Sequence, residues 1–581
     1  MRIVRLALVL CCLLAASASA AERPPIAQPV DVGRKAAVAT VDPYASAAAL
    51  DVLRHGGNAV DAAVAGLAAL GVVEPYSIGV GGGGFMVIRT AKGKITTIDG
   101  RETGPASMTP NSFIDPSNGT PYPFNTAVTS GLSVGVPGAL RAWDLALKTY
   151  GTRPLKKLLQ PAIDLARGGF VMDATLNQQT KDNAARFARF PSTAAIYLNP
   201  DGTAKPTGST ITNPDLANTL ETVAKGGVDA FYNGPIANDI ASTVQHPPTA
   251  QGDSVMAGGM TPADIAAYKA IPRAPTHVNF RGLDVWGMGP PSSGGTTMGE
   301  ALNVMGGYPA TPDDRVTFLH RYLESTARAY ADRAAFLGDP AFTPVPTCGL
   351  LSPPFADTRR ATIGATAATR PVAAGDPNPF NGTCPDAIAD PETDTEGPST
   401  TNLVTADEHG NVVVATFTIE QTGGSGIVVP GRGFLLNNEL TDFDFTAGHP
   451  NSAAAGKRPR SSISPTMVTS AGKPYLALGS PGGATIITTV LQTLLERVDM
   501  RKSLPGAIET PRLSDRNGAK ADAEPDFLAS PQAADLQALG HQFNQVPEIG
   551  AATGIDWLDA RRMQAVAESR RRGGGSAMAI G

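Results

Sequence analysis

Two threonines, Thr400 and Thr418, lie in a segment whose pattern predicts a β-hairpin, and together they could support nucleophilic chemistry. Two β-rich runs flank a turn from Asp407 to Gly410. If the loop holds three residues with Gly410 as the bulge, Thr400 lies opposite Thr418 and their side chains touch. A four-residue loop shifts this pairing by one residue, and a threonine pair across a hairpin is usually structural. A threonine hydroxyl is a poor nucleophile at neutral pH and needs an adjacent base.

Two other motifs of chemical interest fit their usual roles poorly. Residues 131–135 match the nucleophile elbow G-x-S-x-G around Ser133, but Pro137 would remove a donor from the following helix and no acid or histidine partner is marked downstream. The glycine run 79–84 satisfies G-x-G-x-x-G, yet Pro75 breaks the approach and an apolar strand follows it. A glycine-lined turn beside another backbone is the better interpretation of that run.

Ten short motifs, in order along the chain, resemble those of the γ-glutamyltransferase (γ-glutamyl transpeptidase) family of N-terminal-nucleophile hydrolases. The resemblance extends from about residue 36 to the C-terminus. The motifs occupy 56–63, 81–86, 99–102, 290–295, 330–333, 337–340, 400–401, 436–439, 457–459 with 461–462, and 479–483. Each motif alone would be weak evidence, whereas ten in the right order are highly specific.

The resemblance implies a precursor that cuts itself before Thr400. Thr400 Oγ would attack the carbonyl of Ser399, and the new terminal α-amine, with a pKa of about 7.7 to 8.0, would then serve as the base. Thr418 would hydrogen-bond the freed terminus. The implied fold is a single α/β domain of the four-layer αββα type, in which a large subunit (21–399) and a small catalytic subunit (400–581) stay interleaved as a heterodimer.

The resemblance also assigns the oxyanion and donor-binding residues. The segment 480–483 is expected to turn from a strand (475–479) into a helix (484–495), so its amides can point at an anion. The expected oxyanion donors are the amides of Gly482 and Gly483. The α-carboxylate of a γ-glutamyl group would bind Arg101, Ser461 and Ser462, and its ammonium would bind Glu420, Glu439 and Asp442.

The chain departs from the family pattern in three places. Asn402 follows the threonine pair where the family commonly has histidine, and Glu420 stands where many members have asparagine. Between Phe443 and Lys457 lie only 13 residues, fewer than in members with a lid over the pocket. We therefore predict an open cleft, which would favour water as the acyl acceptor or admit bulky donors.

The predicted activity is removal of the γ-glutamyl group from glutathione or a related compound and its transfer to water, an amino acid or a peptide. No cofactor is required, and the seven histidines show no metal-ligand spacing. Three alternatives stay open: a glutaryl or cephalosporin-type acylase of the same fold, an uncleaved exported binding protein, and a serine hydrolase that uses Ser133.

Composition and the N-terminus indicate an exported protein that does not bind nucleic acid. The 581 residues include 47 basic and 52 acidic side chains, for a net charge of −5, so no overall basic field exists. Arg2 and Arg5 precede an apolar run over 6–16 and a small-residue site at 18–20, which is typical of a signal peptide cleaved after Ala20. We expect a periplasmic or secreted protein with no membrane attachment after that cleavage.

The elements that must position these residues are mixed helices and strands. The pattern predicts two alanine-rich helices within 43–71, separated by Gly56-Gly57, then paired strands at 85–89 and 95–99. Further helices are expected at 138–149, 155–167 and 314–336. Residues 339–399 lack periodicity and are expected to form a long exposed segment, in which Cys348 and Cys384 either close one disulfide or remain free thiols.

Overall fold

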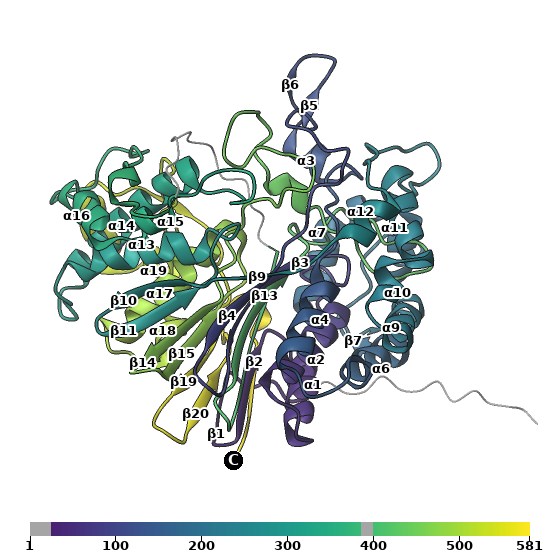
Figure 1. The fold of residues 1–581 in the computed structure, drawn as a ribbon, viewed down its shortest axis with the longest axis horizontal. Coiled ribbons are helices and arrows are strands. Elements are labelled where there is room, and N and C mark those ends of the chain that lie inside the picture. Colours follow the sequence, from purple (N-terminus) through teal and green to yellow (C-terminus); the bar gives the residue numbers. More distant parts are fainter. Residues whose placement is uncertain (1–24, 385–398) are drawn as a thin grey trace, which may run out of the picture.

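A computed structural model describes residues 25–384 and 399–581 of the chain. Two seven-stranded antiparallel sheets stack face to face, and helices cover the outer face of each (Figure 1). This four-layer αββα order is the one that the family resemblance implies. The predicted signal peptide lies outside the described residues. Within the described part of the chain, no helix combines the length and apolar character needed to cross a bilayer.

The first sheet carries the threonine hairpin at its centre. Its strands, in spatial order, are β21 (Ser576–Ile580), β2 (Ala36–Thr40), β12 (Thr401–Asp407), β13 (Val412–Thr418), β3 (Gly83–Arg89), β4 (Ile95–Gly100) and β9 (Ile271–Arg273). The second sheet supplies the glycine turn. Its strands are β1 (Val30–Gly33), β20 (Met563–Val566), β19 (Thr553–Trp557), β15 (Lys473–Gly479), β14 (Thr466–Ser470), β11 (Leu283–Gly287) and β10 (Thr276–Phe280).

Helices from one stretch of the chain share a core with the first sheet. They are α1 (Pro43–Arg54), α2 (Ala59–Val73), α4 (Ala139–Tyr150), α5 (Leu155–Leu158), α6 (Gln160–Gly168), α7 (Ala174–Phe187), α8 (Pro191–Tyr197), α9 (Pro214–Gly226), α10 (Asp229–Tyr232), α11 (Pro235–Gln245) and α12 (Pro262–Ala267). The predicted break at 56–57 is confirmed, and Asn58 caps α2 by accepting from the Val60 and Asp61 amides.

The second sheet is covered mainly by α13 (Gly294–Gly306), α14 (Arg315–Phe336) and α17 (Ile486–Val498). Nearby lie α15 (Thr347–Leu350), α16 (Pro353–Ala361), α18 (Leu504–Glu509), α19 (Pro525–Leu528) and α20 (Pro531–Ala538). Short elements complete the chain: α3 (Phe124–Val128), β5 (Ile114–Asp115), β6 (Thr120–Pro121), β7 (Phe170–Val171), β8 (Thr210–Ile211), β16 (Leu513–Ser514), β17 (Ala521–Ala523), β18 (Phe543–Gln545), η1 (Asn378–Phe380), η2 (Glu439–Asp442), η3 (Gly483–Thr485) and η4 (Arg571–Gly573).

Alternation along β12 decides which side chains face the space between the sheets. Leu403 packs into the helix-side core, whereas Val404 packs among residues of both sheets. Because successive side chains of a strand point to opposite faces, even-numbered residues of β12 look toward the second sheet. Residue 400 extends this series at the start of the strand, so Thr400 projects into the layer between the sheets.

Two sequence expectations need correction. The helix expected at 155–167 is divided at Leu159, where α5 ends and α6 begins. Residues 339–384 are not a featureless exposed segment, because α15, α16 and η1 form there and Phe355 is buried in a small core with Leu350. The remainder of that segment, 385–398, lies outside the described residues. Of the two alternatives left open for Cys348 and Cys384, the structure has the disulfide.

Candidate active site

The hairpin has the register that a three-residue loop predicts. Thr401 pairs with Phe417, and Gly410 closes the loop with a φ of +86°. Thr400 therefore lies opposite Thr418, and their hydroxyl oxygens are 3.5 Å apart. Both side chains are buried, with 3% exposure each. The structure thus brings the two threonines together as the sequence predicts.

The Thr400 hydroxyl lies against the carbonyl group of the residue that precedes it. The chain is continuous here, and Thr400 Oγ1 donates to the carbonyl oxygen of Ser399. Thr418 Oγ1 donates to the same oxygen at 3.0 Å, while the Ser399 hydroxyl donates to the carbonyl of Tyr76 at 2.6 Å. Two hydroxyl donors on one carbonyl oxygen polarise it, which is the arrangement needed for attack at its carbon.

An arginine from the end of the chain fixes the other side of Thr400. Arg572 Nη1 donates to the Thr400 carbonyl at 2.7 Å, and Nη2 donates to Ser77 Oγ at 3.0 Å. Sequence reasoning missed Arg572, since it lies 172 residues from Thr400 and no spacing connects them. Its contact restrains the backbone of the predicted nucleophile, Thr400.

The glycine turn after β15 offers unused amides near the threonines. Gly482 and Gly483 have φ values of +139° and +55°, which glycine adopts without strain. Neither amide donates a hydrogen bond to another of the described residues. Orphan N–H groups at the start of a helical turn suit an anion. The following helix begins at Ile486, after a 3-10 turn, two residues later than expected.

The predicted donor-binding charges form one buried cluster. The Arg101 guanidinium pairs with Glu439 through Nη1 and with Asp442 through Nη2, and all three side chains are nearly inaccessible. Glu420 lies nearby, where its Oε2 accepts from Asn438 Nδ2 at 2.5 Å. The cluster places a guanidinium beside carboxylates, so it offers both kinds of charge to a ligand that carries a carboxylate and an ammonium.

Glu102, beside Arg101, is a further buried acid. Its carboxylate oxygens have no hydrogen-bond partner among the described residues. Burial raises the pKa of Glu102 to about 8, and Arg101 opposes that rise. Sequence reasoning placed Glu102 only within a family motif and gave it no role.

The two serines differ in what their hydroxyls contact. Ser462 Oγ accepts from Arg333 Nη2 at 2.8 Å, whereas Ser461 Oγ accepts from the Ile463 amide at 3.2 Å. Arg333 also donates to Ser293 Oγ at 2.8 Å. Ser461 lines the pocket beside Thr400, whereas Ser462 lies outside that lining and is held by Arg333.

One small pocket collects most of the predicted site. Its lining comprises Arg101, Ser399, Thr400, Thr418, Glu420, Glu439, Asp442, Ser461, Ile463, Gly483 and Ile486. Of the predicted site residues, Gly482 and Ser462 lie outside this lining. With Ser399 in place the pocket has about 10 Å³ of room, enough for about one water molecule. A γ-glutamyl group therefore has no space in the uncut chain.

The two sequence motifs set aside earlier have structural roles. The buried Ser133 hydroxyl donates to the carbonyls of Val128 and Ser130, and the Ser133 carbonyl accepts from Leu440 at the start of η2. In the glycine run, a Cβ on Gly82 would lie 2.2 Å from the Thr418 carbonyl oxygen. The run is thus a close backbone approach beside the threonine hairpin.

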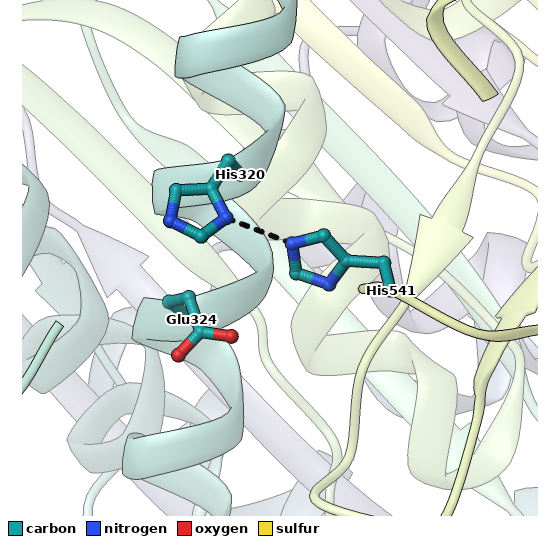
Figure 2. Close-up of side chains that lie close together, drawn as sticks. All are labelled: His320, Glu324 and His541. Carbon is teal, nitrogen blue, oxygen red and sulfur yellow. Dashed lines mark hydrogen bonds between the residues drawn. The ribbon is translucent and has the colours of Figure 1, made fainter. Parts of the chain in front are cut away.

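A histidine cluster on the far side of the second sheet could be mistaken for a metal site (Figure 2). His320 and Glu324 lie on α14 and face His541, and their potential ligand atoms lie within 4.8 Å of one another. His320 Nδ1 and His541 Nε2 are 2.8 Å apart and share a hydrogen bond. Both Glu324 oxygens accept from guanidinium groups, those of Arg328 and Arg370, at 2.7 Å. We assign no metal here, because those ion pairs already occupy the carboxylate.

The chain was compared with known proteins. The family model described as gamma-glutamyltranspeptidase matches residues 45–578. A glutathione hydrolase proenzyme of Bacillus subtilis (strain 168) is 39% identical over 555 residues, which cover 94% of this chain and 92% of that protein. An acylase ACY 1 proenzyme of Pseudomonas sp. (strain V22) is 35% identical, over 89% of this chain and 88% of that protein.

A solved structure shows the same fold over nearly the whole length. The crystal structure of a cephalosporin acylase from Bacillus halodurans superposes with a TM-score of 0.84 at 28% identity. The match covers 96% of this chain and 98% of that one.

Proposed function

Because the chain belongs to the γ-glutamyltranspeptidase family of N-terminal-nucleophile enzymes, we propose that it cleaves itself before Thr400 and then transfers γ-glutamyl groups. The observation that carries this proposal is the Ser399 carbonyl, which accepts hydrogen bonds from both Thr400 and Thr418 at the centre of the donor-binding residues. The donor is glutathione or a related γ-glutamyl compound, and the acceptor is water, an amino acid or a peptide.

Self-cleavage begins with attack by Thr400 Oγ1 on the Ser399 carbonyl carbon. The C–N bond to residue 400 breaks, its nitrogen takes up a proton, and Ser399 is left as an ester on the threonine oxygen. Water then hydrolyses the ester to give a Ser399 carboxylate and a Thr400 α-amine. Thr418, which already donates to the carbonyl oxygen, stabilises the negative charge that develops there.

Turnover uses the groups that this cut creates. The Thr400 α-amine accepts the hydroxyl proton as Oγ1 attacks the γ-carbonyl of the donor, and the amides of Gly482 and Gly483 stabilise the oxyanion. The leaving amine takes the proton, and a γ-glutamyl ester remains on Thr400. Water or an amine then attacks this ester and regenerates the hydroxyl. Before the cut, residue 400 has only a non-basic amide nitrogen.

The buried charge cluster recognises the γ-glutamyl group. Arg101 binds its α-carboxylate together with Ser461 and Ser462, and its ammonium binds Glu420, Glu439 and Asp442. The existing ion pairs of Arg101 with Glu439 and Asp442 place the two kinds of charge side by side, as the donor's carboxylate and ammonium require. Movement of the new Ser399 carboxylate end away from Thr400 after the cut would provide the space that the donor needs.

The mature protein would consist of two interleaved subunits outside the cytoplasm. Residues 1–20 are removed as a signal peptide, and residues 21–399 and 400–581 form the large and small subunits. β12 pairs with β2 and β13 pairs with β3, so strands from both subunits are hydrogen-bonded to one another in one sheet. This pairing supports a heterodimer that stays together after the cut.

An acylase for glutaryl or cephalosporin-type amides is a second candidate, favoured by the similarity to the cephalosporin acylase and to ACY 1. The acidic side chains of the pocket argue for the γ-glutamyl donor, because a glutaryl group carries no ammonium. Comparing kcat/KM for a γ-glutamyl anilide and the matching glutaryl anilide separates the candidates. We expect the γ-glutamyl anilide to be cleaved faster, and faster cleavage of the glutaryl anilide would overturn the assignment.

A further inference from the structure

The side-chain amide of Asn402 joins the two sheets beside the site. Asn402 lies on β12, two residues after Thr400 and on the same face, and it is fully buried. Its Oδ1 accepts from Thr553 Oγ1 of β19 at 2.7 Å, and its Nδ2 donates to Thr416 Oγ1 of β13 at 2.6 Å. We propose that the bond to Thr553 makes Asn402 a positioning residue, which sets the nucleophile strand in register with the oxyanion turn (480–483). This inference rests on the proposed function, because it names positioning residues for the same reaction.

The proposed chemistry draws on both sheets. Thr400 and Thr418 belong to the hairpin of the first sheet, whereas the oxyanion turn continues β15 of the second sheet. The distance between the nucleophile and the oxyanion amides therefore depends on how the sheets stack, and the hydrogen bonds within each sheet do not set it. A displacement of about 1 Å at a reacting group can cost about a hundred-fold in rate. Turnover thus requires contacts that fix the offset between the sheets.

The bond from Asn402 to Thr553 is a directional contact in a layer that is otherwise rich in aliphatic side chains. The layer between the sheets also holds Val404, Val414 and Ile555, which are fully buried. Hydrophobic contacts are non-directional, so they resist a small slide of one sheet over the other only weakly. A buried hydrogen bond has a preferred length and angle and is costly to leave unmade. The amide therefore selects one offset.

The second-sheet end of this bond leads directly to the oxyanion turn. Thr553 pairs with Gly479, the residue before the turn, and a Cβ on Gly479 would lie 2.0 Å from the Asn402 side chain. The segment that precedes Thr553 supports the turn as well, because the Ala551 amide donates to Ser480 Oγ at 3.0 Å. A shift of Asn402 relative to Thr553 would therefore move the turn relative to the nucleophile.

The two reactions of Thr400 should respond differently to the loss of this bond. Self-cleavage uses Thr418 as a donor to the developing oxyanion, and Thr418 lies on the same hairpin as the nucleophile. Turnover uses the amides of the oxyanion turn, which belongs to the second sheet. Loss of the bond between Asn402 and Thr553 should therefore slow turnover and spare self-cleavage, whereas a general loss of stability would affect both reactions.

Thr553→Val tests this inference, with Thr416→Val as the matched control. Both threonines are fully buried, and each variant keeps the side-chain shape and removes one hydrogen bond to the Asn402 amide. The difference is that Thr416 lies in the same sheet as Asn402. Self-cleavage is followed on denaturing gels, and turnover is measured as kcat and KM for γ-glutamyl-4-nitroanilide with the self-cleaved protein.

Thr553→Val should lower kcat about ten-fold, with KM and the self-cleavage rate within about two-fold of the wild-type values. Thr553→Ser, which keeps the hydroxyl, should retain most of the wild-type kcat, and Thr416→Val should keep both rates close to wild type. Asn402→Ala removes the bond from its other end and should also lower kcat while sparing self-cleavage. This second variant decides the question if Thr553→Val proves insoluble.

Three results would overturn the inference: an unchanged kcat in Thr553→Val or Asn402→Ala, an equal fall of kcat and the self-cleavage rate, or an equal loss of kcat in Thr416→Val. If the self-cleaved wild-type protein does not turn over γ-glutamyl-4-nitroanilide, the proposed function fails and this inference fails with it.

Discussion

Replacing Thr418 by valine should slow self-cleavage while leaving the fold intact. Valine keeps the shape of the buried threonine but removes the hydroxyl that donates to the Ser399 carbonyl at 3.0 Å and accepts from the Glu420 amide at 2.9 Å. The first bond stabilises charge that develops during attack, and the loss of about 1.5 to 3 kcal/mol corresponds to a rate about ten- to a hundred-fold lower. The Glu420 amide, left without its acceptor, should lower the free energy of unfolding by about 1 to 3 kcal/mol.

The assay for this effect is pulse-labelled cell-free synthesis, in which the uncut chain and its two products are followed on a denaturing gel. Thr416→Val is the matched control, because Thr416 lies on the same strand and face but bonds to the Asn402 side chain instead. Thr416→Val should cut at close to the wild-type rate, and Thr418→Ser should retain most of it. Wild-type kinetics in Thr418→Val would refute the role given to this hydroxyl.

Three further predictions concern the glycine turn and two buried titratable groups. Gly482→Ala should lower kcat about a hundred-fold, because a Cβ at φ +139° would lie 2.8 Å from Thr485 Oγ1 and displace the amide that binds the oxyanion. An unchanged kcat in the self-cleaved variant would contradict the role given to that amide. Burial raises the pKa of Glu300, and the Asp332 carboxylate raises it further. The folded state therefore favours the protonated form, and the free energy of unfolding of the wild-type protein should fall as pH rises above about 4.5. Glu300→Gln should therefore raise Tm at pH 8 and leave it similar at pH 5, as thermal melts would show. Burial and His320 lower the pKa of His541 from 6.5 to about 4. The free energy of unfolding should therefore fall, by on the order of 2 kcal/mol, as pH drops from 6.5 to about 4. In urea titrations, His541→Gln should make the free energy of unfolding depend less on pH over this range.

The hairpin shows what local sequence can predict. A three-residue turn closed by glycine sets the pairing of every residue behind it and places Thr400 opposite Thr418, whereas the four-residue loop that the sequence also allowed would shift that pairing by one. The helix break at Gly56-Gly57 and the cap at Asn58 are likewise local signals. The resemblance to a known family then supplied a reason to regard the threonine pair as catalytic.

The parts that sequence reasoning could not supply depend on distant partners. The stretch 457–460 would be a solvated basic segment if judged singly, yet Arg458 is buried, its Nε lies 3.4 Å from Asp99 and its amide donates to Asp339. Arg572 contacts Thr400 from 172 residues further along the chain. These contacts arise only when the two sheets stack, and no local spacing encodes them.

The central claim is that breaking the bond between Ser399 and Thr400 creates the active enzyme. Intact-mass analysis with N-terminal sequencing of purified active protein tests it most directly. We expect two chains, one that begins at Thr400 and one that ends at Ser399, and a Thr400→Ala variant that stays uncut and inactive. Full activity in a preparation that consists of one unbroken polypeptide would contradict the account.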